Sequence, residues 1–151
     1  QGVVAHLSTV DVPVAIATGE KVEASGKEVI AAVALGYEAS GRIGESISPE
    51  YMYKHGFHNS VVTIFSGAVA AAKLLGLDQE QMTHAIVLAA TFAGGLGGSR
   101  RTPARGLHAG NSAMQGVNAA LAAQRENESG DNIAVAVARV IPGAQSQSGS
   151  A

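Results

Sequence analysis

Small and aliphatic side chains at helical spacing constrain the fold of this chain more than any other feature. The segment 60–76 is apolar and rich in alanine, as expected of a helix that is buried on most of its circumference. Hydrophobic residues make up 46% of the 151 residues and aromatic residues only 4%, so the core must be built from Ala, Val, Leu, Ile and Gly. No segment before residue 131 shows convincing strand alternation. The sequence therefore predicts an all-α protein, a bundle of closely packed helices.

Caps and helix breakers place the predicted helices along the chain. Pro13 is typical of a first helical turn and predicts a short helix that closes near Gly19. Ser25 and Glu28 form a capping box at the start of a helix predicted from Gly26 to Ser46. The other predicted elements are a short turn over 48–56, helices over 60–76, 79–93 and 108–125, a flexible basic loop over 94–107, and a last helix or strand over 131–140.

Composition and charge exclude several classes of function. The chain has no Cys, which excludes disulfides, thiolate metal sites and cysteine nucleophiles. A net charge of −2 and the absence of Trp give no reason to expect nucleic acid. The apolar stretches fall short of the roughly 20 residues that span a bilayer. We expect a cytoplasmic protein without nucleic-acid or membrane partners, with a helical domain over 1–141, which is part of a larger domain, and a flexible tail over 142–151.

Histidine and arginine are the residue types left for chemistry. His55 and His58 flank a Gly-Phe pair before a buried helix, where a pocket mouth can form, although such residues are more often caps or surface residues. Arg100, Arg101 and Arg105 lie in a loop that leads into a helix. Guanidinium groups pair with carboxylates or phosphates, and a helix N-terminus adds oriented amide donors. From the residues alone, an anion site and a solvated basic loop are equally supported.

Three sequence blocks, in order, resemble those of one known family. They read EVIAAVALGYEASGRIGESISP, GFHNSVVTIFSGAVAAAKLLGLDQEQMTHAIVLAATFAGGL and ARGLHAGNSAMQGVNAALAA. The blocks resemble the MmgE/PrpD family, which contains 2-methylcitrate dehydratase, cis-aconitate decarboxylase and iminodisuccinate epimerase, and the resemblance covers about residues 6–125. It implies part of a large helical domain, with the family's lid domain missing here. It also implies homodimers, small di- or tricarboxylate substrates, and catalysis without a metal or an organic cofactor.

The resemblance also implies roles for individual residues. His58 matches the active-site histidine of the family's Gly-Phe-His block, and His6 matches the histidine that lies seven residues before a proline, although Leu7 replaces the family's Pro. Arg105 matches a substrate-binding Lys, and its guanidinium keeps the positive charge but does not give up a proton. Together with the arginines of the basic loop, this gives the expected site: His58 and His6 are the catalytic residues, and the substrate-binding residues are Arg105, Arg101, Arg100 and His108.

Three hypotheses for the function remain open at this point. The favoured one is a lyase, a dehydratase for a substrate such as 2-methylcitrate, with decarboxylation and epimerisation as alternatives that start from a similar carbanion-like species. The second is a helical scaffold or dimerisation module, and the third is a metal-dependent enzyme that uses His55 and His58. In the scaffold hypothesis, the faces that pack against another subunit are made by Gly36, Ser40 and Gly44, and by Gly67, Ala70 and Ala71.

Overall fold

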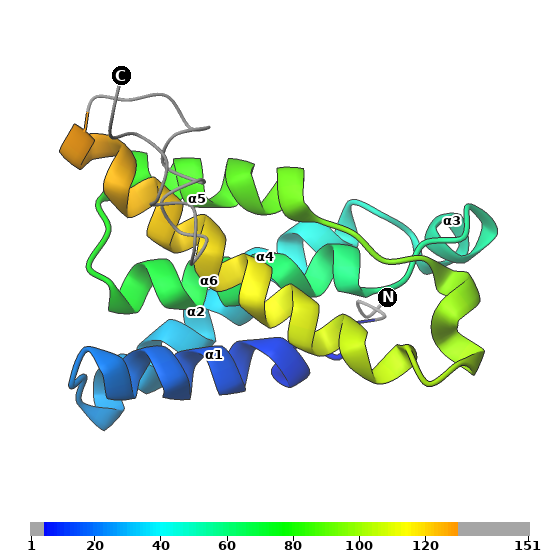
Figure 1. Ribbon diagram of the computed structural model, residues 1–151, viewed down its shortest axis with the longest axis horizontal. Coiled ribbons are helices and arrows are strands. Elements are labelled where there is room, and N and C mark those ends of the chain that lie inside the picture. Colours follow the sequence, from blue (N-terminus) through cyan, green and yellow to red (C-terminus); the bar gives the residue numbers. More distant parts are fainter. Residues whose placement is uncertain (1–4, 130–151) are drawn as a thin grey trace, which may run out of the picture.

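The computed structural model describes residues 5–129, and these residues form a bundle of helices (Figure 1). Apart from an isolated bridge between Phe57 and Leu96, this range contains no β structure, which confirms the all-α prediction. The predicted element over 131–140 and the predicted tail over 142–151 lie outside the described residues. In chain order the elements are α1 (Ser8–Lys21), α2 (Gly26–Glu45), α3 (Pro49–Lys54), α4 (Ser60–Leu74), α5 (Gln79–Phe92), the 3₁₀ helix η1 (Gly97–Arg101) and α6 (Arg105–Ser129).

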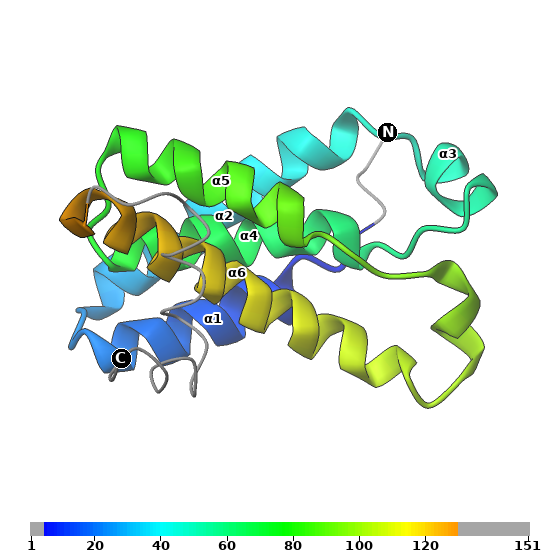
Figure 2. The same ribbon diagram turned by 45° about the horizontal axis from the view of Figure 1, so that its top comes forward.

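Helix α4 is the centre of the bundle. It packs against α1, α2, α5 and α6, and Figures 1 and 2 show it in the middle of these helices. Its residues over 62–72 are all buried, which confirms the prediction of a helix with little exposed surface. The helix ends at Leu74, slightly before the predicted Gly76. Within the described range, every helix is too short or too polar to cross a membrane.

Glycine and serine allow the helix backbones to approach one another closely. A Cβ atom built on Gly116 of α6 would lie 2.8 Å from the backbone N of Ala68 and 2.9 Å from the carbonyl O of Ile64 in α4. On the other side of α4, the Ser40 hydroxyl of α2 donates a hydrogen bond of 2.7 Å to the carbonyl O of Val62. These contacts bring the helix backbones close together in a core that is built mostly from small and aliphatic residues.

The small-residue faces of the scaffold hypothesis are used inside this chain. Gly36, Ser40 and Gly44 of α2 are buried, and a Cβ atom on Gly36 would lie 2.8 Å from the carbonyl O of Ser66 in α4. Gly67, Ala70 and Ala71 of α4 are buried as well. The prediction that these faces pack against another subunit is therefore wrong, because neighbouring helices of the same chain already cover them.

Replacing Gly116 by alanine is expected to lower the free energy of unfolding by roughly 1–3 kcal/mol, because the added methyl group meets backbone atoms that cannot rotate away. The matched control is Gly110→Ala on the same helix. Nothing lies within 4 Å of its Cβ position, so alanine should stabilise the helix by up to about 1 kcal/mol. Urea unfolding followed by circular dichroism measures both variants. Equal stability of the two would contradict the close α4–α6 packing.

The ends of α2 follow the sequence pattern. The backbone N–H of Glu28 donates to the Ser25 hydroxyl at 3.4 Å, and the backbone N–H of Ser25 donates to the Glu28 carboxylate at 2.7 Å. This is the predicted capping box, and the helix runs from Gly26 to Glu45 as expected. The hydrogen bonds of the cap also hold the pKa of Glu28 below its ordinary value.

The predicted start of α1 is wrong. The helix begins at Ser8, so Pro13 lies inside it rather than in its first turn. Proline lacks the N–H that would close a helical hydrogen bond, which is why it normally marks a helix start. Here Val10 and Val14 are buried at helical spacing, while Pro13 faces outward. The burial of this apolar face stabilises the turn before Pro13 and outweighs the missing hydrogen bond.

The predicted boundary between the basic loop over 94–107 and the next helix is also wrong. The loop contains the 3₁₀ helix η1, and α6 begins at Arg105 instead of His108. Pro103 accounts for the earlier start, since its fixed φ angle suits the beginning of a helix and its carbonyl accepts a hydrogen bond from the N–H of Gly106 at 3.4 Å. Arg105 is therefore held on a helix rather than on a loop.

Asp11 is a carboxylate buried in the core. Its exposed fraction is 0%, and neither side-chain oxygen has a hydrogen-bond partner among the described residues. It faces Gly36 of α2, beside the carbonyl of Ser66 in α4. Burial raises the pKa of Asp11 to about 7, because the charged form loses its hydration there. Near neutral pH this side chain is therefore divided between its protonated and its charged form.

Candidate active site

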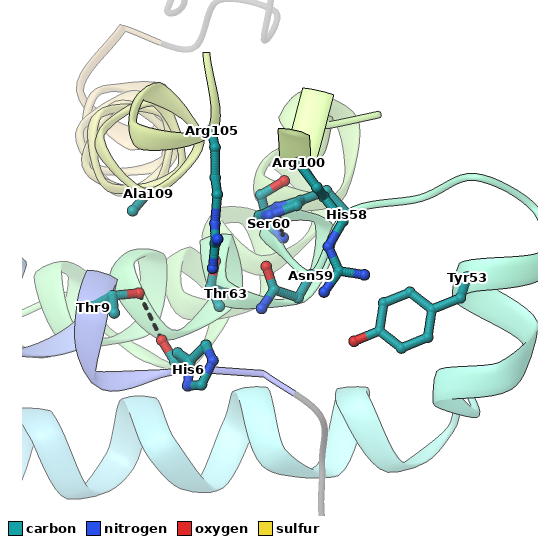
Figure 3. A pocket seen from close by; sticks show the side chains of 10 residues that line it. All are labelled: His6, Thr9, Tyr53, His58, Asn59, Ser60, Thr63, Arg100, Arg105 and Ala109. Carbon is teal, nitrogen blue, oxygen red and sulfur yellow. Dashed lines mark hydrogen bonds between the residues drawn. The ribbon is translucent and has the colours of Figure 1, made fainter. Parts of the chain in front are cut away.

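A pocket of about 190 Å³ opens where the N-terminal ends of three helices meet (Figure 3). Thr9 belongs to the first turn of α1, Ser60 begins α4, and Arg105 begins α6. Figure 3 shows the Arg105 side chain extending from α6 toward Thr63 of α4. The remaining residues that line the pocket are His6, Tyr53, His58, Asn59, Arg100 and Ala109.

The pocket carries positive charge. Arg100 and Arg105 line it, and no acidic residue does. Among the residues that the structure describes, no carboxylate forms an ion pair with Arg100 or Arg105. Each helix N-terminus adds about half a positive elementary charge, and neither α4 nor α6 has an acidic residue in its first turn. The pocket is therefore suited to an anion.

His58 is held in one tautomer. The backbone N–H of Ser60 donates to Nδ1 of His58 at 3.1 Å, so the neutral ring carries its proton on Nε2. Burial lowers the pKa of His58 below its ordinary value of 6.5, and the charges of His108, Arg100 and Arg105 lower it further. At neutral pH His58 is therefore a neutral imidazole that can donate a hydrogen bond through Nε2.

His108 lies against His58 and outside the pocket lining. The two rings stack with centroids 4.2 Å apart and an interplanar angle of 17°. Nε2 of His108 shares a hydrogen bond with the hydroxyl of Ser99. His108 is therefore placed to orient the His58 ring, and its predicted contact with a substrate stays a prediction.

The basic loop over 94–107 is hydrogen-bonded to the start of α4. The backbone N–H of His58 donates to the carbonyl of Gly95 at 3.0 Å, and the hydroxyl of Ser60 donates to the carbonyl of Gly94 at 2.7 Å. Gly95 has a φ of +134°, and a Cβ atom there would collide with the Ser60 hydroxyl. Glycine is required at this position because the loop backbone touches the segment that holds His58.

On the opposite side of the pocket, His6 is anchored through its backbone. The carbonyl of His6 accepts a hydrogen bond of 2.7 Å from the Thr9 hydroxyl and one of 3.1 Å from the Thr9 backbone N–H. Figure 3 shows this contact and places the imidazole of His6 across the pocket from His58. The two histidines therefore face the same cavity from different segments.

The structure brings four of the six predicted site residues to the pocket, namely His6, His58, Arg100 and Arg105. Arg101 is exposed and does not line it. Arg100 and Arg101 are neighbours in a 3₁₀ helix, where consecutive side chains point about 120° apart. One of the two can therefore reach the pocket while the other faces solvent.

Sequence reasoning did not single out Tyr53, Asn59 and Thr63 as site residues. Asn59 follows His58 directly and Thr63 lies one helical turn further on, so helical spacing from His58 was a usable signal for both. No comparable signal marks Tyr53, because its position depends on how α3 docks against η1.

His55 lies outside the pocket lining. Its ring stacks on Tyr51 with centroids 4.0 Å apart, and its Nδ1 lies 2.8 Å from the Tyr51 carbonyl O. Among residues 5–129, no three side chains of His, Asp or Glu gather as a set that could hold a metal ion. Within that range, a metal ion bound by His55 and His58 would therefore have no third ligand from these residue types.

The described residues thus form an all-helical domain with a pocket lined by histidine and arginine, and comparison with known proteins gives its family. The profile of the MmgE/PrpD N-terminal domain matches residues 1–138. The chain belongs to the MmgE/PrpD family.

Two curated relatives show which activities occur among similar proteins. The chain is 34% identical over 97 residues to a cis-aconitate decarboxylase of Aspergillus terreus, a match that covers 60% of this chain and 20% of the relative. It is 33% identical over 100 residues to a human cis-aconitate decarboxylase, covering 66% of this chain and 21% of the relative. The matched part of the chain thus spans about a fifth of the length of these relatives. No solved structure matches the chain.

Proposed function

We propose that the protein, in its full-length form, is a lyase that acts on a small di- or tricarboxylate by proton transfer through His6 and His58. One observation carries the proposal: two histidines and two arginines from four separate segments line one pocket that has no acidic residue. A cavity of about 190 Å³ fits a small organic acid rather than a large cofactor.

The two arginines are proposed to bind the carboxylates. A guanidinium group presents paired N–H donors that match the two oxygens of a carboxylate. Arg100 and Arg105 approach the pocket from η1 and α6, respectively, so each can hold a different carboxylate of one substrate. The positive ends of α4 and α6, which have no acidic residue in their first turns, add to this attraction and stabilise the negative charge that develops on a carbanion-like intermediate.

For dehydration, the proton transfers divide between the two histidines. His6 removes a proton from the carbon beside a carboxylate. The carboxylates of the bound substrate raise the pKa of His58, so that its ring takes up a second proton, and the resulting imidazolium donates a proton to the leaving hydroxyl group, which departs as water. In the free protein the Ser60 N–H donates to Nδ1 of His58, which leaves Nε2–H as the group that can hydrogen-bond to the substrate. Dehydration of a 2-methylcitrate-like substrate stays a prediction.

Decarboxylation is the second proposed reaction, and the names of the curated relatives favour it. Loss of CO₂ from a tricarboxylate such as cis-aconitate breaks a carbon–carbon bond and leaves its electron pair on the substrate. A proton from His58 then completes the reaction at carbon, so that one proton is consumed for each CO₂ released. The same arginines would bind the remaining carboxylates in either reaction.

Assays of the full-length protein with 2-methylcitrate and with cis-aconitate test the proposal. Dehydration is measured as the appearance of a carbon–carbon double bond by ultraviolet absorbance, and decarboxylation as CO₂ release. We expect turnover of one of the two substrates. Failure to turn over either, or any related tricarboxylate, would contradict the lyase proposal and favour a helical scaffold.

Saturating citrate is expected to raise the melting temperature of the full-length protein by roughly 5–10 °C, because a ligand that binds only the folded state stabilises it. Arg105→Ala should abolish this shift, since it removes a guanidinium that lines the pocket. The matched control is Arg101→Ala, which removes an equal charge outside the pocket. Thermal unfolding with and without citrate measures the effect, and equal shifts in the two variants would remove Arg105 from the site.

A further inference from the structure

Tyr53 lines the pocket and has no role in the mechanism above. It belongs to α3 and is 40% exposed. The guanidinium carbon of Arg100 lies 4.7 Å from the centroid of the Tyr53 ring. Figure 3 shows the two side chains next to each other on one side of the pocket, with the Tyr53 hydroxyl directed toward the cavity.

The backbone holds α3 and η1 together at this point. The N–H of Gly97, the first residue of η1, donates to the carbonyl of Gly56 at 2.6 Å. Phe57 and Leu96 form an isolated β bridge beside it. A Cβ atom on Gly97 would lie 3.2 Å from the same carbonyl, so the close approach favours glycine. The contact between Tyr53 and Arg100 is therefore fixed by the fold of two segments that are far apart in sequence.

An aromatic ring can hold a guanidinium group in place while the group keeps its positive charge. It attracts the cation through its negative face without neutralising the charge as a carboxylate would. Within the described range Arg100 has no acidic partner. Its N–H donors therefore stay available to an anion while the ring restricts where the group lies.

Building on the proposed function, we propose that Tyr53 is a positioning residue that holds Arg100 so that Arg100 and Arg105 bind two carboxylates of the same substrate. The ring of Tyr53, rather than its hydroxyl, has this role. Two guanidinium groups in fixed positions bind a ligand with two or more carboxylates more tightly than a ligand with one. Tyr53 thereby sets the preference of the site for di- and tricarboxylates.

Calorimetric titration of the full-length protein with tricarballylate, a tricarboxylate, and butyrate, a monocarboxylate, tests this role. Tyr53→Leu is expected to raise the Kd for tricarballylate about 3- to 10-fold and to leave binding of butyrate nearly unchanged. Tyr53→Phe keeps the ring and should stay within about 2-fold of the wild type. Tyr51→Leu is the matched control, because Tyr51 lies on the same helix and stacks on His55 outside the pocket.

Turnover gives a second measurement that general destabilisation would not mimic. Tyr53→Leu should raise KM by the same factor as Kd and change kcat by less than about 2-fold, because it weakens binding without touching the proton transfers. Wild-type binding of tricarballylate with an unchanged Kd in Tyr53→Leu would overturn the role of Tyr53 alone. Equal losses in Tyr53→Phe and Tyr53→Leu would assign the effect to the hydroxyl instead. Absence of wild-type binding would overturn the proposed function together with this inference.

Discussion

Replacing His58 by alanine is expected to lower kcat by at least about 10²-fold, the usual contribution of a general acid or base. The reason is the position of the ring, which lines the pocket and is held by the Ser60 N–H with its proton on Nε2. Removal of the ring leaves the proposed proton transfer without a donor. Steady-state kinetics of the full-length protein with the preferred tricarboxylate measures the effect.

His55→Ala is the matched control for this experiment. His55 is the same residue type, three positions away, and its ring stacks on Tyr51 outside the pocket. We expect its kcat and KM to stay within about 2-fold of the wild type. Equal activity of the His58 and His55 variants would remove His58 from the mechanism, whereas equal and large losses in both would point to a general structural effect.

Replacing Asp11 by asparagine is expected to stabilise the protein at neutral pH, by roughly 2–4 kcal/mol at pH 8. Asp11 is fully buried without a hydrogen-bond partner among the described residues, and burial raises its pKa from 3.8 to about 7. The groups that face it, Gly36 of α2 and Ser66 of α4, carry no charge. The neutral asparagine therefore avoids the cost of burying a charge in this part of the core.

The raised pKa of Asp11 also determines how the stability of the wild type changes with pH. A raised pKa means that the folded state binds the proton of Asp11 more tightly than the unfolded state does. The wild type therefore loses stability as pH rises from about 4 to 7, and the loss is complete above the folded-state pKa. The advantage of Asp11→Asn should vanish near pH 4 and reach its full size above pH 7.

Urea unfolding of the full-length protein between pH 4 and 8 measures this difference. Glu20→Gln is the matched control, because Glu20 is an exposed carboxylate on the same helix, and it should change stability by less than about 0.5 kcal/mol at each pH. A difference between Asp11→Asn and the wild type that stays constant from pH 4 to 8 would contradict a buried, titrating Asp11.

Most of the helices could be predicted because their signals are local. The capping box of Ser25 and Glu28, for example, marks the start of α2 within a few residues of sequence. Pro13 misled the prediction of α1, because the burial of Val10 and Val14 against other helices is a tertiary effect. The sequence does not mark the start of α6, because Pro103 lies in a glycine- and arginine-rich stretch that is typical of a loop.

A family motif marked three of the four predicted residues that line the pocket. His6, His58 and Arg105 were singled out by resemblance, and all three line the pocket. Arg100 lines the pocket and Arg101 does not, because the 3₁₀ helix sets the directions of their side chains. The sequence alone does not show which of these neighbouring arginines faces the pocket. Tyr53 depends on the docking of α3 against η1, a contact between segments more than forty residues apart.

The central claim is that His6, His58, Arg100 and Arg105 form one binding site for a molecule with several carboxylates. A crystal structure of the full-length protein with bound tricarballylate tests it most directly. The account predicts one carboxylate on Arg105, a second on Arg100 beside the Tyr53 ring, and the carbon chain between the two imidazoles. Tricarballylate bound elsewhere, with this pocket holding only water, would contradict it.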